Sequence, residues 1–326
     1  MLNSFSAISQ DVQFSQYYNL IQFQNPAFVG TSIAWRATLH SRVQWPGIDA
    51  KYVTGVAAVD YNLSKYNSGV GVMFVSDDQE SAIRSYKAMA QYAYQANLSS
   101  KTILRAGINT GLVNKTLNNA ALYYPEQFNG SGFNNQNNTS VTSKNYLDIT
   151  TGLLLYTDYF WLGVSAAHIN NPNQSLTGGI DRIPVKFDFL TGIKINLLSK
   201  QTMRYLTEND EDVWSIYPTL LYKYQGKSDQ LDIGLHTIYD IFKIGLWYRG
   251  LPVKNYDQRT NNESVIALAG IKIRNVSVSY SYDFGISNLA PYSRGAHELN
   301  LTILHQNKKK AEQKYKSLPC PEFYGF

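Results

Sequence analysis

Apolar and polar residues alternate one by one over several stretches of this 326-residue chain. The same period of two returns in the stretches 186–197, 241–250 and 275–284. Because successive side chains of a β-strand point to opposite faces, the pattern predicts strands with one apolar and one polar face. In the stretch 33–45, one face carries Trp35, Ala37, Leu39, Val43 and Trp45, and the other carries Arg36, Thr38, His40, Arg42 and Gln44.

Turn-forming residues divide the chain into about fourteen predicted strands. Most of them approach the roughly ten residues that a tilted strand needs to cross a bilayer, whereas soluble strands average about five or six. The predicted strands cover residues 33–45, 51–63, 69–78, 83–98, 102–113, 146–156, 159–170, 186–197, 213–225, 230–238, 241–250, 263–273, 275–284 and 295–305.

The lengths of the connections favour a membrane barrel over a soluble sandwich, which periodicity alone cannot separate. Tight turns are predicted on one side, and long Asn-, Ser- and Gly-rich loops on the other, at 114–145, 171–185, 251–262 and 285–294. Outer-membrane barrels have this asymmetry: the short turns face the periplasm, and both chain termini lie on that side. The connections 78–82 and 226–229 are too short for this scheme and 198–212 is too long, so the strand count is open by two.

Composition supports the same fold class, an all-β transmembrane antiparallel β-barrel of the outer-membrane type. Aromatic residues are abundant, with 25 Tyr, 14 Phe and 5 Trp, and amphipathic rings suit the two membrane interfaces. No stretch of about 18 uncharged apolar residues is present, which excludes an ordinary transmembrane helix. The net charge of +5 is dispersed along the chain, which argues against a nucleic-acid partner.

Motifs for catalysis, cofactors and metals are weak. Residues 69–72 (GVGV) lack the third glycine and the helix of a nucleotide site, and the acidic run 208–212 matches no calcium loop and indicates a solvated loop. The single cysteine, Cys320, permits no intrachain disulfide. We therefore expect no enzyme, cofactor or metal site. A Ser/His pair on the barrel wall stays open, because triads are spatial rather than sequential.

A basic stripe is predicted on the lumen face of the first strand, where Arg36, His40 and Arg42 share a side with Gln44. One interpretation is that this stripe orients an anionic or polypeptide ligand. The interpretation we favour is a lumen packed with salt bridges and hydrogen bonds, because buried charge in a narrow barrel has to be paired.

Several motifs resemble those of one family. The run 10–18 (QDVQFSQYY), followed by 25–30 (NPAFVG), resembles the mature N-terminus of the PorP/SprF family, where "QDPQFSQY…NPAYAG" is usual. The run 42–48 (RVQWPGI) is similar to the family's "R-x-Q-W-x-G-I". Residues 280–284 (YSYDF) and 295–299 (GAHEL) resemble its "YSYD…S-L…G-x-H-E" ending, and 320–323 (CPEF) its "C-P-R-F" tail. Val12 and Glu322 depart from the usual Pro and Arg.

The resemblance implies a type IX secretion system outer-membrane protein of Bacteroidota. It implies export and surface anchoring of a large secreted adhesin, of the gliding-motility type, through the adhesin's C-terminal domain. Partners would be that adhesin, other secretion components, and lipid and lipopolysaccharide. The alternatives are a porin or hydrophobic-solute channel and a membrane-embedded hydrolase, for which His40, His168, His236 and His297 are the candidate residues.

The expected organisation is a signal-peptide remnant at 1–9, a periplasmic or plug segment at 10–32, the barrel at 33–305 and a periplasmic tail at 306–326. Small residues Ala7 and Ser9 before Gln10 favour the signal-peptide remnant. The segment 10–32 is too polar for lipid and too aromatic to be free, so we expect it in or across the periplasmic mouth. Candidate partner or lumen contacts are Phe14, Tyr17, Asn25, Pro26, Arg36, His40, Arg42, Gln44, Trp45, Tyr282, Asp283, His297 and Glu298.

Overall fold

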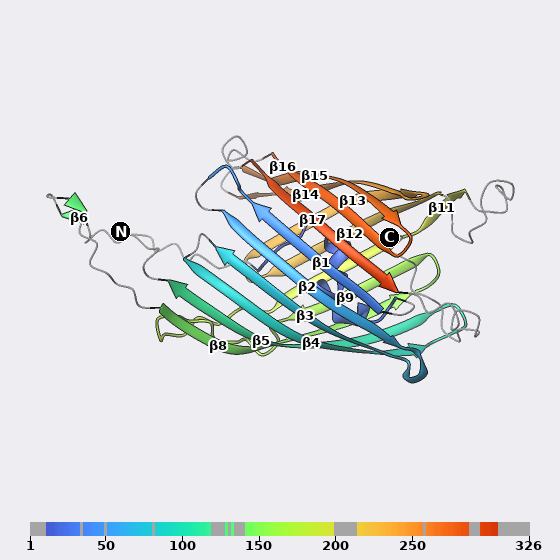
Figure 1. The fold of residues 1–326 in the computed structure, drawn as a ribbon, viewed down its shortest axis with the longest axis horizontal. Helices are drawn as coiled ribbons and strands as arrows, with labels where there is room; N and C mark the ends of the chain where they lie inside the picture. Colours follow the sequence, from blue (N-terminus) through green and yellow to red (C-terminus); the bar gives the residue numbers. More distant parts are fainter. Residues whose placement is uncertain are drawn as a thin grey trace.

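A long antiparallel sheet closes on itself into a barrel (Figure 1). The computed structural model describes residues 11–32, 35–48, 51–79, 82–118, 128–129, 132–133, 141–198, 214–256, 259–286 and 294–305. The predicted signal remnant, the acidic run 208–212 and the C-terminal tail with Cys320 lie outside these described residues.

Each strand pairs with its neighbours in sequence, and β1 pairs with β17 to join the two ends of the sheet. β10 and β11 both pair with β12, so they act as one strand interrupted at Lys194, and the barrel has 14 strands. The strands are β1 (Trp35–Gln44), β2 (Tyr52–Leu63), β3 (Ser68–Gln79), β4 (Ile83–Asn97), β5 (Ile103–Asn118), β8 (Val141–Tyr156), β9 (Phe160–Ala167), β10 (Lys186–Ile193), β11 (Ile195–Leu198), β12 (Trp214–Gln225), β13 (Ser228–Tyr239), β14 (Phe242–Tyr256), β15 (Arg259–Ile273), β16 (Val276–Gly285) and β17 (Ala296–His305). The predicted fold class and strand count are confirmed.

The two faces of the barrel wall have opposite character. Outward side chains are apolar and exposed, as at Phe74 (60%) and Leu112 (68%), while inward side chains such as Arg36 and Glu298 are polar and 1% exposed. A water-soluble sandwich would bury the apolar face, so this wall is built to meet hydrocarbon on its outside.

Five short connections lie at one end of the barrel, at 64–67, 98–102, 157–159, 240–241 and 274–275, and we call this end the turn rim. The opposite end is the loop rim, which has the long connection 168–185 and also short ones. The predicted loop 251–262 is wrong, because β14 continues to Tyr256 and β15 begins at Arg259. The predicted loop 114–145 is shorter than expected, because β5 continues to Asn118 and β8 begins at Val141. Between them lies a small hairpin of two strands with two residues each, β6 (Phe128–Asn129) and β7 (Gly132–Phe133). Most of the connection 198–212 lies outside the described residues, and no described helix is long and apolar enough to cross a membrane.

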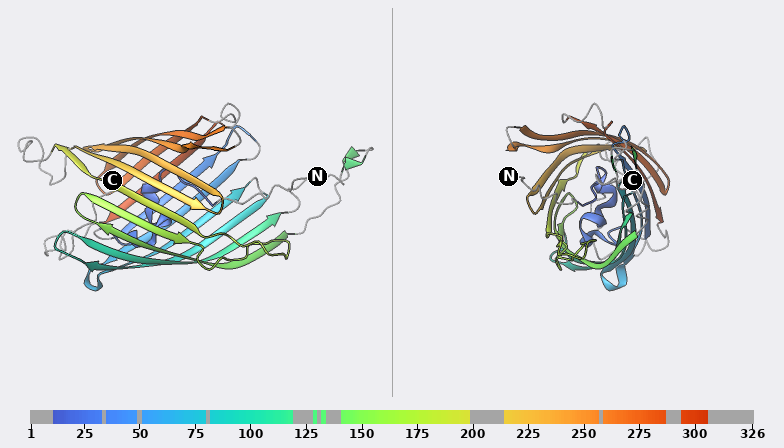
Figure 2. Two further views of the ribbon diagram at one scale, coloured as in Figure 1. Left: turned by 180° about the vertical axis from the view of Figure 1, so that it is seen from behind. Right: turned by 90° about the vertical axis from the view of Figure 1, so that its left-hand side faces the viewer.

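Residues 11–32, which we call the lumen segment, lie inside the barrel (Figure 2). The segment folds into short helical turns, η1 (Tyr17–Leu20), α1 (Ile21–Gln24) and η2 (Pro26–Phe28); a further turn, η3 (Ser64–Tyr66), links β2 to β3. Its first residue, Asp11, bonds to His168 just beyond β9 at the loop rim. Its end packs at the turn rim, where Gly30 lies against Gly69 at the start of β3. The segment therefore runs most of the length of the lumen rather than covering one mouth.

Candidate functional site

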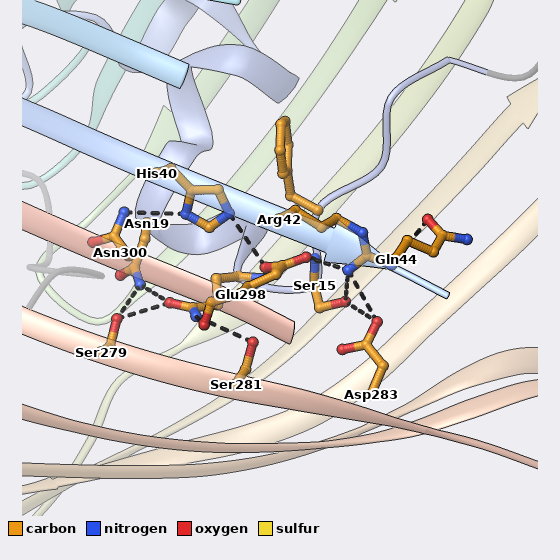
Figure 3. A network of polar contacts seen from close by, with 12 residues as sticks. Ser15, Asn19, His40, Arg42, Gln44, Ser279, Ser281, Asp283, Glu298 and Asn300 are labelled. Atoms are coloured by element: carbon orange, nitrogen blue, oxygen red, sulfur yellow. Dashed lines mark hydrogen bonds and ion pairs between the residues drawn. The ribbon is translucent and has the colours of Figure 1, made fainter. Parts of the chain in front are cut away.

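Glu298 of β17 holds the loop-side half of the lumen segment (Figure 3). The two carboxylate oxygens of Glu298 accept hydrogen bonds from the backbone N–H groups of Ser15 (2.7 Å) and Gln16 (2.8 Å). The Gln16 amide also donates to the Glu298 carbonyl at 3.1 Å. These N–H groups precede η1 and lack partners within that turn, so the carboxylate supplies the acceptors they need.

Arg42 ties the same carboxylate to a second one. Its Nη1 bonds to Glu298, to Asp283 Oδ2 at 3.0 Å and to Ser15 Oγ at 3.0 Å, and the Ser15 hydroxyl donates to Asp283 at 2.6 Å. His40 Nε2 lies 3.4 Å from the second Glu298 oxygen. Every member of this cluster is buried, so each charge depends on the others for compensation.

Strand register explains how the charges meet. Arg42 stands directly opposite Glu298 in the β1–β17 ladder, and Arg36 stands opposite Asp60 in the β1–β2 ladder. Arg36 pairs with Asp60 at 2.8 and 3.0 Å, and Asp60 also accepts the Gly30 N–H at 2.8 Å. Cross-strand pairing thus neutralises the wall and leaves acceptor oxygens for the lumen segment.

Further along the wall, the same rule places a third pair. Arg249 of β14 stands opposite Asp232 of β13 and bonds to it at 3.0 and 3.3 Å. Arg249 also reaches Asp283 at 3.4 Å, which links this pair to the Glu298 cluster. The arginines of the predicted basic stripe are therefore occupied by carboxylates of the wall, as the packed-lumen interpretation expects.

The turn-side half of the lumen segment is held by fit as well as by hydrogen bonds. The Asn25 side chain accepts a hydrogen bond from the Ala27 N–H at 2.9 Å and so caps the start of η2. Its amide nitrogen donates to the carbonyls of Leu153 (2.9 Å) and Val164 (3.1 Å). Arg105 donates to the Ala27 carbonyl at 2.9 Å. A Cβ added at any of three wall glycines would overlap the segment, and these glycines are Gly69, Gly107 and Gly152.

Stacked rings fill the lumen beside η1. The His236 ring lies parallel to Tyr217, with centroids 4.7 Å apart, and stacks on Tyr18 at 5.3 Å. Trp247 stacks on Tyr18 at 4.9 Å and donates to the Thr219 hydroxyl at 3.1 Å, which Tyr17 also contacts at 3.0 Å. The lumen is therefore occupied on this side by aromatic packing rather than by open space.

A charged latch holds the first residue of the lumen segment at the loop rim. His168 bonds to Asp11 at 2.7 Å through Nε2 and to Asp148 at 2.8 Å through Nδ1, and Lys186 lies 3.5 Å from Asp11. Burial alone would lower the pKa of His168, but the Asp11 and Asp148 carboxylates outweigh it and raise this pKa to about 9. Burial likewise favours the neutral form of Asp11, yet the charges of His168 and Lys186 hold its pKa well below the usual value. We call these four residues the latch.

The predicted contact residues fall into three groups. Gln44 sits at the edge of the lumen network, 3.4 Å from Arg42, and Trp45 packs edge-on against Tyr52. On the outer side of the wall, Tyr282 and His297 lie together with ring centroids 4.8 Å apart. The residues in the lumen are Phe14, Tyr17, Asn25, Pro26, Arg36, His40, Arg42, Asp283 and Glu298.

Sequence reasoning missed several of the residues that hold the lumen segment. Asp60, Arg105 and Arg249 carry no motif, and only their position on the polar face of a strand could have pointed to them. Asp11 lies in a segment with no regular period, and His168 lies just beyond β9, although the predicted strand 159–170 included it. Among the described residues, no cluster of three or more His, Cys, Asp or Glu side chains could hold a metal ion.

A closed barrel with an apolar outer wall and a polar, ion-paired lumen defines an outer-membrane β-barrel protein of bacteria. Residues 6–303 match the family described as type IX secretion system membrane protein PorP/SprF. The chain belongs to this family, and the resemblance of its motifs is confirmed. It is an outer-membrane barrel of the type IX secretion system, and this family and fold are those of a secretion component or channel rather than of an enzyme class.

Solved structures with a similar fold are remote in sequence. The Pseudomonas putida toluene transporter TodX is 10% identical, with 87% of this chain and 93% of that chain covered and a TM-score of 0.50. The Ralstonia pickettii toluene transporter TbuX is 12% identical over 86% and 91% of the two chains, with a TM-score of 0.48. These likenesses concern the fold alone. No curated protein sequence matches the chain.

Proposed function

We propose that this barrel supports export and surface anchoring of a large secreted adhesin, of the gliding-motility type, by binding the adhesin's C-terminal domain. Family membership supports a place in the secretion system. The observation that carries the proposal is the lumen segment, which is bonded to the wall from the loop rim to the turn rim. A lumen filled in this way favours a partner held on the outside of the barrel over one threaded through it.

The two rims suit two kinds of partner. Short turns of outer-membrane barrels face the periplasm, where other components of the secretion system would dock. The loop rim would face the outside and hold the C-terminal domain, because loops carry recognition without disturbing the barrel ladder. The lumen segment would then act as a plug that keeps the outer membrane sealed while cargo is attached.

The test is surface retention of a reporter. A fluorescent protein fused to the adhesin's C-terminal domain is expressed in the native host with and without the gene for this barrel. We expect the reporter on the cell surface of the parent, and its loss to the medium or the periplasm in the deletion strain. Equal surface retention in the two strains would contradict the proposal, and a fusion lacking the C-terminal domain is the control.

A porin or hydrophobic-solute channel is the second candidate, because the fold is shared with TodX, a toluene transporter. Conductance in planar bilayers separates the two functions. We expect the intact protein to pass little current and a variant lacking residues 11–32 to pass large, steady currents. Large currents from the intact protein would favour the channel and would remove the plug role of the lumen segment.

A further inference from the structure

A groove of about 1010 Å³ crosses the outer wall of the barrel over β1 to β5. Outward-facing residues with larger side chains border it, including Leu39, Phe74 and Leu112. The bed of the groove is formed where outward positions carry small residues, namely Ser41, Gly55, Ala57, Ser76 and Ala88.

The polarity of the groove changes from one end to the other. At the β17 end it is bordered by Leu299 and Leu301. At the β5 end it is bordered by Asn114 and Asn145, whose side chains share a hydrogen bond of 2.6 Å. The row runs three or four residues from the strand ends at the loop rim, from Ser41 of β1 to Asn145 of β8. Because the strands are inclined to the barrel axis (Figure 1), the β8 end of the row lies farther along that axis, toward the loop side, than the β1 end.

Register places these residues in one row. Gly55 stands opposite Ser41 on one side and Ser76 on the other, Ser76 stands opposite Tyr86, and Tyr86 stands opposite Asn114. Five neighbouring strands spaced by about 4.8 Å give the row a length of roughly 19 Å. The groove is thus long and narrow, which suits an extended chain molecule.

We propose that this groove binds an acyl chain of an outer-leaflet lipid, with the lipid headgroup at the Asn114–Asn145 end. Outer-membrane barrels direct their longer loops outward, so the loop rim meets the outer leaflet. The volume of the groove is close to the upper end of the range for small-ligand pockets, about 300–1,000 Å³. A stable protein interface instead needs a broad surface of roughly 800 Å² on each partner, so a narrow groove suits a lipid better than a protein.

The chemistry of the two ends matches the two parts of such a lipid. A depression in the hydrocarbon region that stayed empty would lose dispersion contacts along its whole lining, and an acyl chain restores them. The amide of Asn145 and the hydroxyl of Tyr86, which is 51% exposed, can bond to sugar, ester or phosphate oxygens of the headgroup. A membrane lipid bound here would sit at a fixed place on the wall instead of exchanging freely.

The test compares two substitutions on one strand. Ala88 and Ala90 of β4 both face outward and are exposed, but only Ala88 lines the groove. The purified full-length protein, in detergent, is incubated with lipid A or, separately, with phosphatidylethanolamine, and bound lipid is counted by native mass spectrometry after detergent exchange. We expect one retained lipid A per barrel in the parent and in Ala90→Phe, and at least tenfold lower occupancy in Ala88→Phe.

Each other outcome decides against the proposal. Equal lipid retention by Ala88→Phe and the parent, or no retained lipid in the parent, would overturn it. Phosphatidylethanolamine retained as firmly as lipid A would assign the groove to phospholipid and remove the outer-leaflet claim. If the parent forms a dimer that Ala88→Phe disrupts, the groove is an interface between two copies. Thermal unfolding of both variants shows whether the fold is intact.

Discussion

The two ends of the lumen segment are held by different forces. Near the loop rim, Ser15 and Gln16 are held by buried charge, through Glu298 and its partner Arg42. Near the turn rim, residues 25–30 are held by close backbone approach to wall glycines and by hydrogen bonds, both neutral ones and ones to the charged side chains of Arg105 and Asp60. Charge pairing depends on pH and on both partners being present, whereas close packing depends only on shape. The comparison suggests that the loop-side end is the one that solution conditions can release.

The largest expected effect on stability comes from removing the buried carboxylate that holds the loop-side end. In Glu298→Ala, Arg42 and His40 lose a buried partner and two backbone N–H groups lose their acceptor. Breaking a buried pair by removing one member costs roughly 3–5 kcal/mol. We expect a loss of that size in the free energy of unfolding, measured by urea titration in detergent.

The matched control is Glu263→Ala, in β15, where the carboxylate is exposed. Its unfolding free energy should stay within about 0.5 kcal/mol of the parent, as for an ordinary surface substitution. If the two variants lose the same stability, the Glu298 cluster contributes no more than a surface charge, and the contrast between the two ends fails.

A smaller effect on stability is expected from disturbing the close packing of the turn-side end against the wall glycines. In Gly107→Ala the added Cβ would overlap the backbone of Pro26 and Ala27, whereas in Gly55→Ala it would meet nothing within 4 Å. Overpacking costs typically about 1–3 kcal/mol, so Gly107→Ala should unfold at lower urea concentration while Gly55→Ala should not. Equal midpoints for the two variants would show that the turn-side fit is loose.

The strands were predictable because their chemistry is repetitive. In β16 every second residue is apolar, and in β1 only Ser41 interrupts this alternation, so the period is visible without knowledge of any partner strand. The prediction ended β5 too early and began β8 too late. The residues there, such as Lys115 and Lys144, are polar and give no alternating pattern. Strand pairing continues there through backbone hydrogen bonds that no side-chain pattern reveals.

The lumen was predictable only in part. Arg36, His40 and Arg42 occupy alternate positions of one strand, so the basic stripe follows from the sequence alone. Its partners Asp60 and Glu298 depend on which strands become neighbours and in which register. The family motif pointed to Asn25 without indicating that its amide would bridge two strands more than a hundred residues away. Contacts of an irregular segment are set by the closed barrel around it, so they follow from the fold and not from local sequence.

The smallest effect is expected at the latch, and it depends on pH. The raised pKa of His168, about 9 against an ordinary 6.5, means that its contribution is complete below pH 6.5 and is lost as the pH rises through 9. The lowered pKa of Asp11 means that its contribution is present above its ordinary 3.8 and is lost only as the pH falls below that value. Attachment of the first residues should therefore be complete between about pH 4 and 6.5 and should be weakened by pH 10, where Lys186 alone is left opposite Asp11, while the turn-side end stays in place.

A fluorophore on Gln13→Cys, in a Cys320→Ser background, reports this release through quenching by iodide. We expect several-fold stronger quenching at pH 10 than at pH 6, because Asp11 no longer faces a charged imidazole. In His168→Gln the imidazole is absent at every pH, so quenching should be high and nearly independent of pH. Equal quenching of the parent at both values would show that the latch does not govern the loop-side end, and that the Glu298 cluster alone holds it.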